Sequence, residues 1–382
     1  MVVGSGYRNH TMHVGKPSRY PSFARRVGYL VVLASLLAGC ASVVKPTISA
    51  SPALSASPAP TASPSPLASL SPSALISPSP SPLPTRSPLP SASPTLGPPG
   101  LLPAYFAVWE PSSATALKDA HSVVMKDYGG SLGRQYQPTS IAQAAIAYYD
   151  HWLTDTDPAE AAADKAVFLA QTDWLIAHQT PDGRWLFNFR WGSQAVPWWS
   201  AMTEGLGMSA LLRAYALTGD PAARMAIERA RSTFERDLDH QGVGTTVAFG
   251  SRSYVVYQEY LKGYEANVLN GWIFSLVGLY EASTYLSDPQ AAHDLWDPDR
   301  GIAALRALLP SYDTGDWSRY DLVDPGPSAR GDLDTNDYHN LVVSQLRYLG
   351  TITGDTFFSD YAERFGAYVS LCEAHGGCPP AS

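Results

Sequence analysis

The hydrophobic positions of this chain divide it into three kinds of segment. A short apolar run at 27–38 is followed by a long stretch, 46–100, without hydrophobic periodicity. Beyond residue 101, apolar residues recur at three- and four-residue spacing. That spacing is typical of helices that bury one face. The pattern therefore predicts a mainly α domain over residues 101–382.

The periodic segments form pairs, and each pair is joined by a turn at an aspartate. The aspartates lie at positions 157, 220, 288 and 355, and proline follows the first three. Aspartate caps a helix by accepting a backbone N–H, and proline fits the first helical turn. The predicted pairs are 141–153 with 159–178, 201–217 with 222–238, 268–286 with a helix ending near 309 after a detour at 290–300, and 338–353 with 357–371.

The first helix of a pair differs in polarity from the second. First helices such as 271–280 are apolar on nearly all sides, whereas second helices such as 225–237 carry an arginine and glutamate face. Helices that are apolar all round are buried on both sides, and repeats of this length share a core only by stacking. We therefore predict an α/α barrel (toroid) of about four helical hairpins, with a few short strands in the loops at one end. An open solenoid is the alternative.

Three long connections, 180–200, 240–266 and 311–336, each leave a second helix and enter a first helix, so they meet at one end of the barrel. Connections of this length are usually functional. They are rich in aromatic and basic residues: Arg184, Trp185, Arg190, Trp191, Trp198, Trp199, Arg252, Tyr254, Tyr257, Tyr260, Lys262, Trp317, Arg319, Tyr320 and Arg330. Aromatic rings stack on sugars and arginine pairs with carboxylates or sulfates, which predicts an anionic saccharide partner. Plain packing of the loops on the barrel end is the alternative.

Composition limits the classes of partner and the cellular address. The net charge of −8 argues against non-specific nucleic-acid binding. Arginines 25 and 26, the apolar run and the Leu-Ala-Gly-Cys ending at Cys40 resemble a bacterial lipoprotein signal over residues 1–40. The prediction is a secreted, cell-surface protein that is lipid-anchored at Cys40; an ordinary signal peptide is the alternative. Residues 41–100, rich in Ser, Pro and Ala, are predicted to form a disordered stalk.

The remaining cysteines, Cys372 and Cys378, lie close together near the C-terminus. In a secreted chain they permit a short disulfide loop. No cysteine and histidine cluster has zinc spacing, so no metal site is predicted.

Several motifs, in their order along the chain, resemble the C-terminal catalytic region of the D-glucuronyl C5-epimerases. The resemblance covers about residues 136–369. The motifs are Trp199-Ser200-Ala201-Met202, LLRAYALTGD at 211–220, Glu259-Tyr260, VLNGWIFSLVGLY at 268–280, LPSYDTGDWSRYDL at 309–322 and Asp337-Tyr338-His339. The resemblance implies an α/α barrel that inverts C5 of a glucuronate within a polysaccharide such as heparosan, without a redox cofactor. It also implies catalytic roles for Tyr260, Tyr320, Tyr338 and Glu259.

The chemistry of this reaction suits tyrosine. The C5 hydrogen lies α to a carboxylate, so one group must remove a proton from one face of the sugar while another returns a proton to the opposite face. A phenol with a pKa near 10 needs nearby cations to act as a base at neutral pH. We expect Tyr260 and Tyr338 to face each other across the sugar, with Tyr320 assisting. Further candidate substrate contacts are Asn270, His339, Arg319, Arg330, Arg190 and Trp199.

Two departures from the family pattern affect what the resemblance implies. The family usually has an arginine where this chain has Val323, and a second histidine in the region of Val342 and Val343. Arg319 and Arg330 are the candidates to supply the missing cation. The alternatives to an epimerase are a polysaccharide lyase acting by β-elimination and a catalytically inactive saccharide-binding lipoprotein. Substrate and oligomeric state do not follow from the resemblance.

Overall fold

The computed structural model describes residues 100–109, 117–192, 194–261, 265–323, 332–375 and 377–378. The proposed signal with Cys40, the proposed stalk and Arg330 lie outside these residues. None of the helices in the part described is both long and apolar enough to cross a bilayer.

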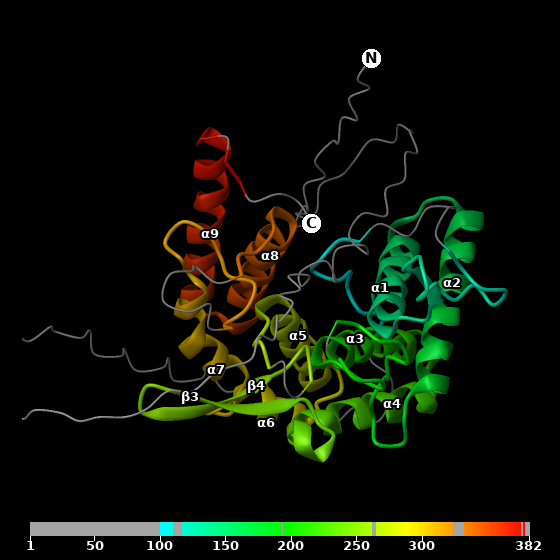
Figure 1. The fold of residues 1–382 in the computed structure, drawn as a ribbon. Coiled ribbons are helices and arrows are strands. Elements are labelled where there is room, and N and C mark those ends of the chain that lie inside the picture. The colour runs from blue at the N-terminus through cyan, green and yellow to red at the C-terminus, as the bar shows by residue number, and fades with distance from the viewer. Residues whose placement is uncertain are drawn as a thin grey trace, which may run out of the picture. The chain divides into compact units, whose positions relative to one another are not determined.

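The helices form the four expected hairpins (Figure 1). They are α1 (Pro138–Thr154) with α2 (Pro158–His178), α3 (Ala201–Thr218) with α4 (Pro221–Ser232), α5 (Leu269–Tyr285) with α6 (Pro289–Trp296) and α7 (Gly301–Leu308), and α8 (Asn336–Thr353) with α9 (Thr356–His375). In every hairpin the turn aspartate accepts a backbone N–H from the start of the following helix: Asp157, Asp220, Asp288 and Asp355. The helical-hairpin prediction is confirmed.

One boundary differs from the expectation. Helix α4 ends at Ser232 rather than near 238, and short 3₁₀ turns follow at Thr233–Glu235 and Leu238–His240. The carbonyl of Thr233 accepts the N–H of Val243 instead of continuing the helix. Gly242 permits this turn, since a Cβ there would lie 2.0 Å from the carbonyl oxygen of Arg236.

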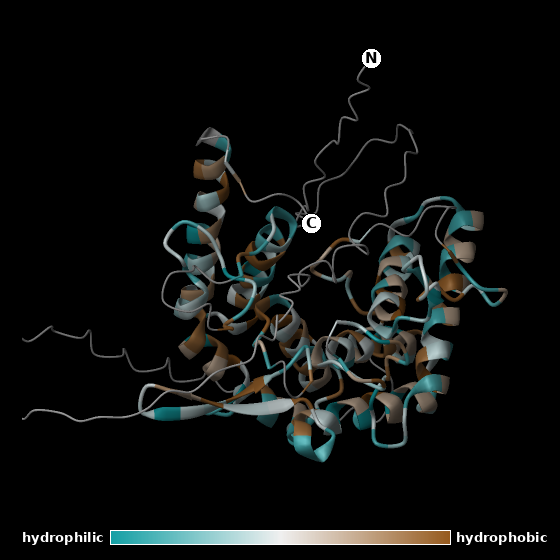
Figure 2. Ribbon diagram, in the orientation of Figure 1, coloured by the Kyte–Doolittle hydropathy of each residue, from teal (hydrophilic) through white to brown (hydrophobic). Residues whose placement is uncertain are grey.

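Helices α1, α3, α5 and α8 form the inner layer, and their partners cover them. Helix α3 buries every residue from Ala201 to Tyr215, whereas α2 buries only Phe168, Gln171, Thr172 and Leu175. Many connecting turns are hydrophilic, while α3 and α5 are mostly intermediate or hydrophobic (Figure 2). Helices α3 and α5 approach closely at two glycines, because a Cβ on Gly278 would lie 2.4 Å from the carbonyl oxygen of Gly205. The fold is an α/α-toroid arrangement with successive inner helices side by side.

Residues 102–109 run across the inner layer near the C-terminal ends of its helices. The Tyr149 hydroxyl of α1 donates to the Leu102 carbonyl (2.8 Å), and the ring of Phe106 stacks on Tyr348 of α8 at 4.5 Å. Tyr105 lies beneath the guanidinium of Arg213 in α3, at 5.1 Å. This segment therefore fills the interior at the end remote from the long connections.

The few strands are short and lie outside the helical layers. Strands β1 (Lys126–Asp127) and β2 (Arg134–Gln135) form one antiparallel pair. Strands β3 (Gly244–Phe249) and β4 (Arg252–Tyr257) form a second, with Gly244 opposite Tyr257. The β3–β4 hairpin occupies the second long connection, and β4 ends three residues before Tyr260.

Candidate active site

The structure brings the three tyrosines together. Tyr260 follows β4, Tyr320 lies in the third connection, and Tyr338 is in the first turn of α8. The hydroxyl oxygens of Tyr260 and Tyr320 are 3.4 Å apart, and the ring centres of Tyr320 and Tyr338 are 5.5 Å apart. Tyr320 therefore contacts both of the others.

Backbone pairing between two connections fixes this arrangement. The N–H of Leu269 donates to the carbonyl of Tyr320 (3.0 Å), and the N–H of Leu322 donates to the carbonyl of Ala266 (2.9 Å). The N–H of Tyr320 is held by the carbonyl of Asp332 (2.8 Å). The segment that carries Tyr320 thus runs beside the chain that enters α5, so the site does not depend on side-chain packing alone.

Glu259 is buried next to Tyr260, with 5% of its surface exposed. A Cβ at position 271 would lie 2.2 Å from its Oε2 atom, so only glycine there leaves room for the carboxyl group. Burial raises the pKa of Glu259 to about 8, although a hydrogen bond from Tyr260 lowers the pKa somewhat. Glu259 is therefore mostly protonated at pH 7.

Tyr320 and Tyr338 are also protonated at rest. Burial raises the pKa of Tyr320 well above its ordinary value, and Glu259 and Tyr260 raise it further. Burial and the nearby Glu259 carboxyl also raise the pKa of Tyr338 well above its ordinary value. The resting site is consequently a group of neutral proton donors, which suits binding of an anion.

A narrow pocket opens beside Tyr260 and Glu259, with room for little more than a water molecule. Its lining residues are Gln137, Thr139, Phe187, Trp198, Ser200, Met202, Glu259 and Tyr260. Trp198 stacks on Phe187 with ring centres 3.8 Å apart, and its ring centre is 6.4 Å from that of Tyr260. Gln137 and Thr139 were not among the residues predicted from the sequence, and Trp198 was named there only as one of the aromatic residues of the first connection.

Asn270 lies at the start of α5, beside the glycine that contacts Glu259, and is 1% exposed. Both polar atoms of its amide lack a hydrogen-bond partner among the described residues, and so does Oε1 of Gln345. The Gln345 amide donates through Nε2 to the backbone carbonyl of Asn270 (2.9 Å). Buried amides without partners are costly, so a ligand that satisfies Asn270 remains our expectation.

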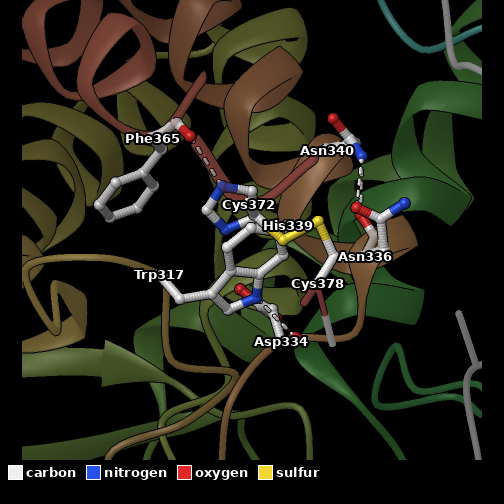
Figure 3. The surroundings of a disulfide bond; sticks show 8 residues. All are labelled: Trp317, Asp334, Asn336, His339, Asn340, Phe365, Cys372 and Cys378. Carbon is white, nitrogen blue, oxygen red and sulfur yellow. Dashed lines mark hydrogen bonds between the residues drawn. A yellow bond between two sulfur atoms is a disulfide. The ribbon is translucent and has the colours of Figure 1, made fainter. Parts of the chain in front are cut away.

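His339 does not have the substrate-facing position expected for it. Its Nε2 atom bonds to the carbonyl of Phe365 (2.8 Å), its Nδ1 atom lies 2.6 Å from the Ser318 hydroxyl, and its ring stacks on Trp317 at 3.8 Å. The side chain is fully buried. Figure 3 shows it beside Trp317 and Phe365, near the disulfide of Cys372 and Cys378, which do pair. These contacts give His339 a structural role rather than a substrate-binding one.

Trp199 also differs from the expectation. Arg184 lies over its ring at 4.2 Å, and its indole N–H donates to the carbonyl of Gly242 (2.8 Å). Its neighbour Trp198 lines the pocket instead. The antiparallel bridge between Phe187 and Trp198 sets which of the two rings turns toward Tyr260.

The two predicted arginines within the described residues have different surroundings. Arg319 directly precedes Tyr320, its Nε atom is buried without a hydrogen-bond partner among the described residues, and its charge lowers the pKa of Asp321 against the larger effect of burial. Arg190 is exposed beside the aromatic residues of the first connection. Val323, at the position of the family arginine, is 45% exposed.

Among the described residues, one group of side chains has metal-ligand spacing: His151, Asp155 and Asp164. It lies at the C-terminal end of α1, and Nδ1 of His151 is already 2.6 Å from a carboxylate oxygen of Asp164. The site around the tyrosines contains no such group within the described ranges.

Comparison with known proteins relates this chain to several others. Residues 179–367 match the family model described as the D-glucuronyl C5-epimerase C-terminus. A D-glucuronyl C5-epimerase of Caenorhabditis elegans is 31% identical over 219 residues, which are 53% of this chain and 35% of the worm protein. An uncharacterized protein of Methanocaldococcus jannaschii is 24% identical over 252 residues, 62% of this chain and 79% of that protein. A solved structure titled UGL_D88N/dGlcA-Glc-Rha-Glc aligns with TM-score 0.40 and 17% identity over 60% of this chain and 61% of that one, a similarity from which we conclude nothing.

Residues 179–367 thus match the family of D-glucuronyl C5-epimerase C-terminal domains. This chain spans about a third of the length of the worm enzyme.

Proposed function

We propose that this chain is an epimerase that inverts C5 of a uronate residue within a polysaccharide, converting D-glucuronate to L-iduronate or a similar pair. The observation that carries the proposal is the meeting of Tyr260, Tyr320 and Tyr338 beside buried Glu259. The three phenols come from separate parts of the chain and are held together by backbone hydrogen bonds. Such a group of proton donors matches a reaction that needs a proton removed and another delivered.

Glu259 and Tyr260 together form the proposed base. When Glu259 is ionised, Tyr260 donates to it, and Tyr260 can take the C5 proton as its own proton passes to Glu259. The C5–H bond breaks and its electron pair moves into the substrate carboxylate, giving an enediolate. The proton therefore comes to rest on the Glu259 carboxyl, whose pKa is about 8, and Tyr260 remains a neutral phenol.

Tyr338 is the proposed acid on the opposite face. Its hydroxyl gives a proton to C5, which completes the inversion and leaves a phenolate. Tyr320 contacts both Tyr260 and Tyr338, so it is placed to donate a hydrogen bond to the enediolate and to relay a proton back. In the reverse direction the roles of Tyr260 and Tyr338 exchange.

The proposed ligand is an anionic, uronate-containing polysaccharide. The match of residues 179–367 to the D-glucuronyl C5-epimerase C-terminus supports this class of ligand. Because Val323 stands at the position of the family arginine, we infer that other groups, the neutral donors of the site among them, hold the substrate carboxylate.

Incubation of the protein with a panel of uronate polysaccharides in D₂O tests the proposal. Deuterium at C5, together with appearance of the epimeric uronate, is expected. New ultraviolet absorbance from an unsaturated uronate would identify a lyase instead. Binding without either change would identify an inactive saccharide-binding protein.

The rate of inversion is expected to depend on the ionisation of Glu259. Because the carboxylate form accepts the Tyr260 proton, the rate should rise with pH and fall about tenfold per unit below the pKa of about 8. Glu259→Gln cannot accept this proton and should lose at least about 10²-fold in kcat. A pH-rate profile of both proteins measures this, and a Glu259→Gln variant with wild-type kcat would remove Glu259 from the base.

We propose that the protein is located at the cell surface and carries a lipid on Cys40. Growth with a labelled fatty acid should label the wild-type chain and not Cys40→Ala. Label retained in Cys40→Ala would contradict the anchor.

A further inference from the structure

Three buried residues connect the two segments that carry Tyr320 and Tyr338. Ser318 precedes Tyr320 by two positions, His339 directly follows Tyr338, and Asp334 lies just before α8. Their side chains are no more than 1% exposed. The Ser318 hydroxyl contacts both a carboxyl oxygen of Asp334 and Nδ1 of His339.

With Asp334 ionised and His339 neutral, the three side chains carry one proton too few to make both contacts of the Ser318 hydroxyl. Nε2 of His339 is 2.8 Å from the carbonyl of Phe365 and must therefore carry a proton. In a neutral ring Nδ1 is then an acceptor, and an ionised Asp334 is an acceptor as well. One serine hydroxyl has a single proton and cannot donate to both. The backbone N–H of Ser318 also donates to Nδ1, at 3.3 Å, but the shorter hydroxyl contact at 2.6 Å needs a proton of its own. The two hydroxyl contacts are satisfied together only if an additional proton lies on Asp334 or on His339.

The surroundings favour Asp334 as the holder of this proton. Burial raises the pKa of Asp334 to about 7, with Ser318 lowering it and Asp321 raising it. Burial lowers the pKa of His339 to about 4. Protonated Asp334 then donates to Ser318, which donates to His339. Within the described ranges, the other titratable groups that act on Asp334 or respond to it are Asp321 in the same connection, Tyr312 before it and Tyr338 in α8.

We propose that Asp334, Ser318 and His339 are positioning residues that share one proton, and that this proton holds the Tyr320 segment in line with the helix that carries Tyr338. For its effect on catalysis the inference rests on the proposed epimerase function. Loss of the proton removes one hydrogen bond between the segments. The N–H of Asp334 still donates to the carbonyl of Ser318 (3.0 Å), and the indole of Trp317 still donates to the carbonyl of Asp334 (2.8 Å; Figure 3). The segments therefore shift relative to each other without unfolding.

Asp334→Asn tests this inference because an amide carries its protons at every pH. Wild-type Asp334 has a folded-state pKa raised above its unfolded value, so its contribution to stability is full below about pH 4 and is lost as pH rises to about 7. The variant has no such loss. The Tm of Asp334→Asn minus that of wild type should therefore increase by at least about 2 to 4 °C between pH 5 and pH 8. This measurement does not depend on any activity. A difference in Tm that is constant or decreases over this range would overturn the shared proton.

The second measurement is kcat for C5 inversion. The ratio of Asp334→Asn to wild type should rise about fivefold from pH 6 to pH 9, since one hydrogen bond is lost only in wild type. Asp157→Asn, which changes a cap at the far end of α1 and α2, should give a constant ratio. Ser318→Ala should lower kcat about 10- to 100-fold with KM little changed, because misplaced catalytic groups affect the chemical step. A wild-type protein inactive on every uronate would contradict the proposed function and leave the Tm measurement to decide the inference. A flat kcat ratio in an active enzyme would overturn the positioning role.

Discussion

Replacement of Tyr338 by phenylalanine abolishes C5 inversion, with an expected loss of at least about 10³-fold in kcat. The variant keeps the ring that packs against Tyr320 at 5.5 Å and removes only the hydroxyl that we propose delivers the proton. No cavity forms, so the thermal melt should stay close to that of wild type. The measurement is the appearance of the opposite epimer, starting separately from each uronate.

Proton exchange measured separately from each uronate epimer distinguishes the groups on the two faces of the sugar. In Tyr338→Phe, the Glu259–Tyr260 side can still exchange the C5 proton of one epimer with D₂O, without inverting it. Tyr260→Phe should show the same behaviour with the other epimer. Tyr254→Phe, in β4, is the matched control and should retain activity. If Tyr338→Phe inverts its substrate within tenfold of the wild-type rate, the proposed acid is another group.

Replacement of Arg213 by methionine lowers the free energy of unfolding by about 3–5 kcal/mol. The Arg213 guanidinium makes two 3.0 Å hydrogen bonds to Glu281, and the two residues are 1% and 2% exposed. Removing one partner leaves the other charge buried and unpaired. Urea unfolding followed by circular dichroism measures the loss.

The exposed pair Arg224–Glu228 on α4 provides the control, with a 3.0 Å contact in solvent. Arg224→Met should cost no more than about 0.5 kcal/mol. The double variant Arg213→Met with Glu281→Leu should recover much of the stability, because no unpaired charge remains. Equal losses of unfolding free energy in Arg213→Met and Arg224→Met would mean that burial of the Arg213–Glu281 pair adds nothing to the cost of removing one partner.

The helical architecture was predictable because its signals are local. Aspartate at the turn, proline after it and the contrast between apolar first helices and polar second helices each fix a boundary or a layer. The convergence of Tyr260, Tyr320 and Tyr338 followed from topology, since connections that leave second helices and enter first helices share one end of the barrel.

The remaining details depend on tertiary contacts that carry no local signal. Trp198 and Trp199 are adjacent and chemically alike, and only pairing with Phe187 decides which one reaches the pocket. His339 adjoins a proposed catalytic residue, yet Phe365, a distant residue of α9, determines its orientation. The role of residues 102–109 could not be read from the sequence either, because a short apolar segment does not show what it packs against.

Residues 102–109 also constrain the order of assembly. Phe106 stacks on Tyr348 and lies against Phe274 at 6.0 Å, so its partners are made long after it during synthesis. Contacts between residues so far apart in the chain close late. A nascent chain therefore leaves Phe106 without its stacking partner until α8 has emerged, and in that interval this part of the segment is exposed to chaperones and to aggregation.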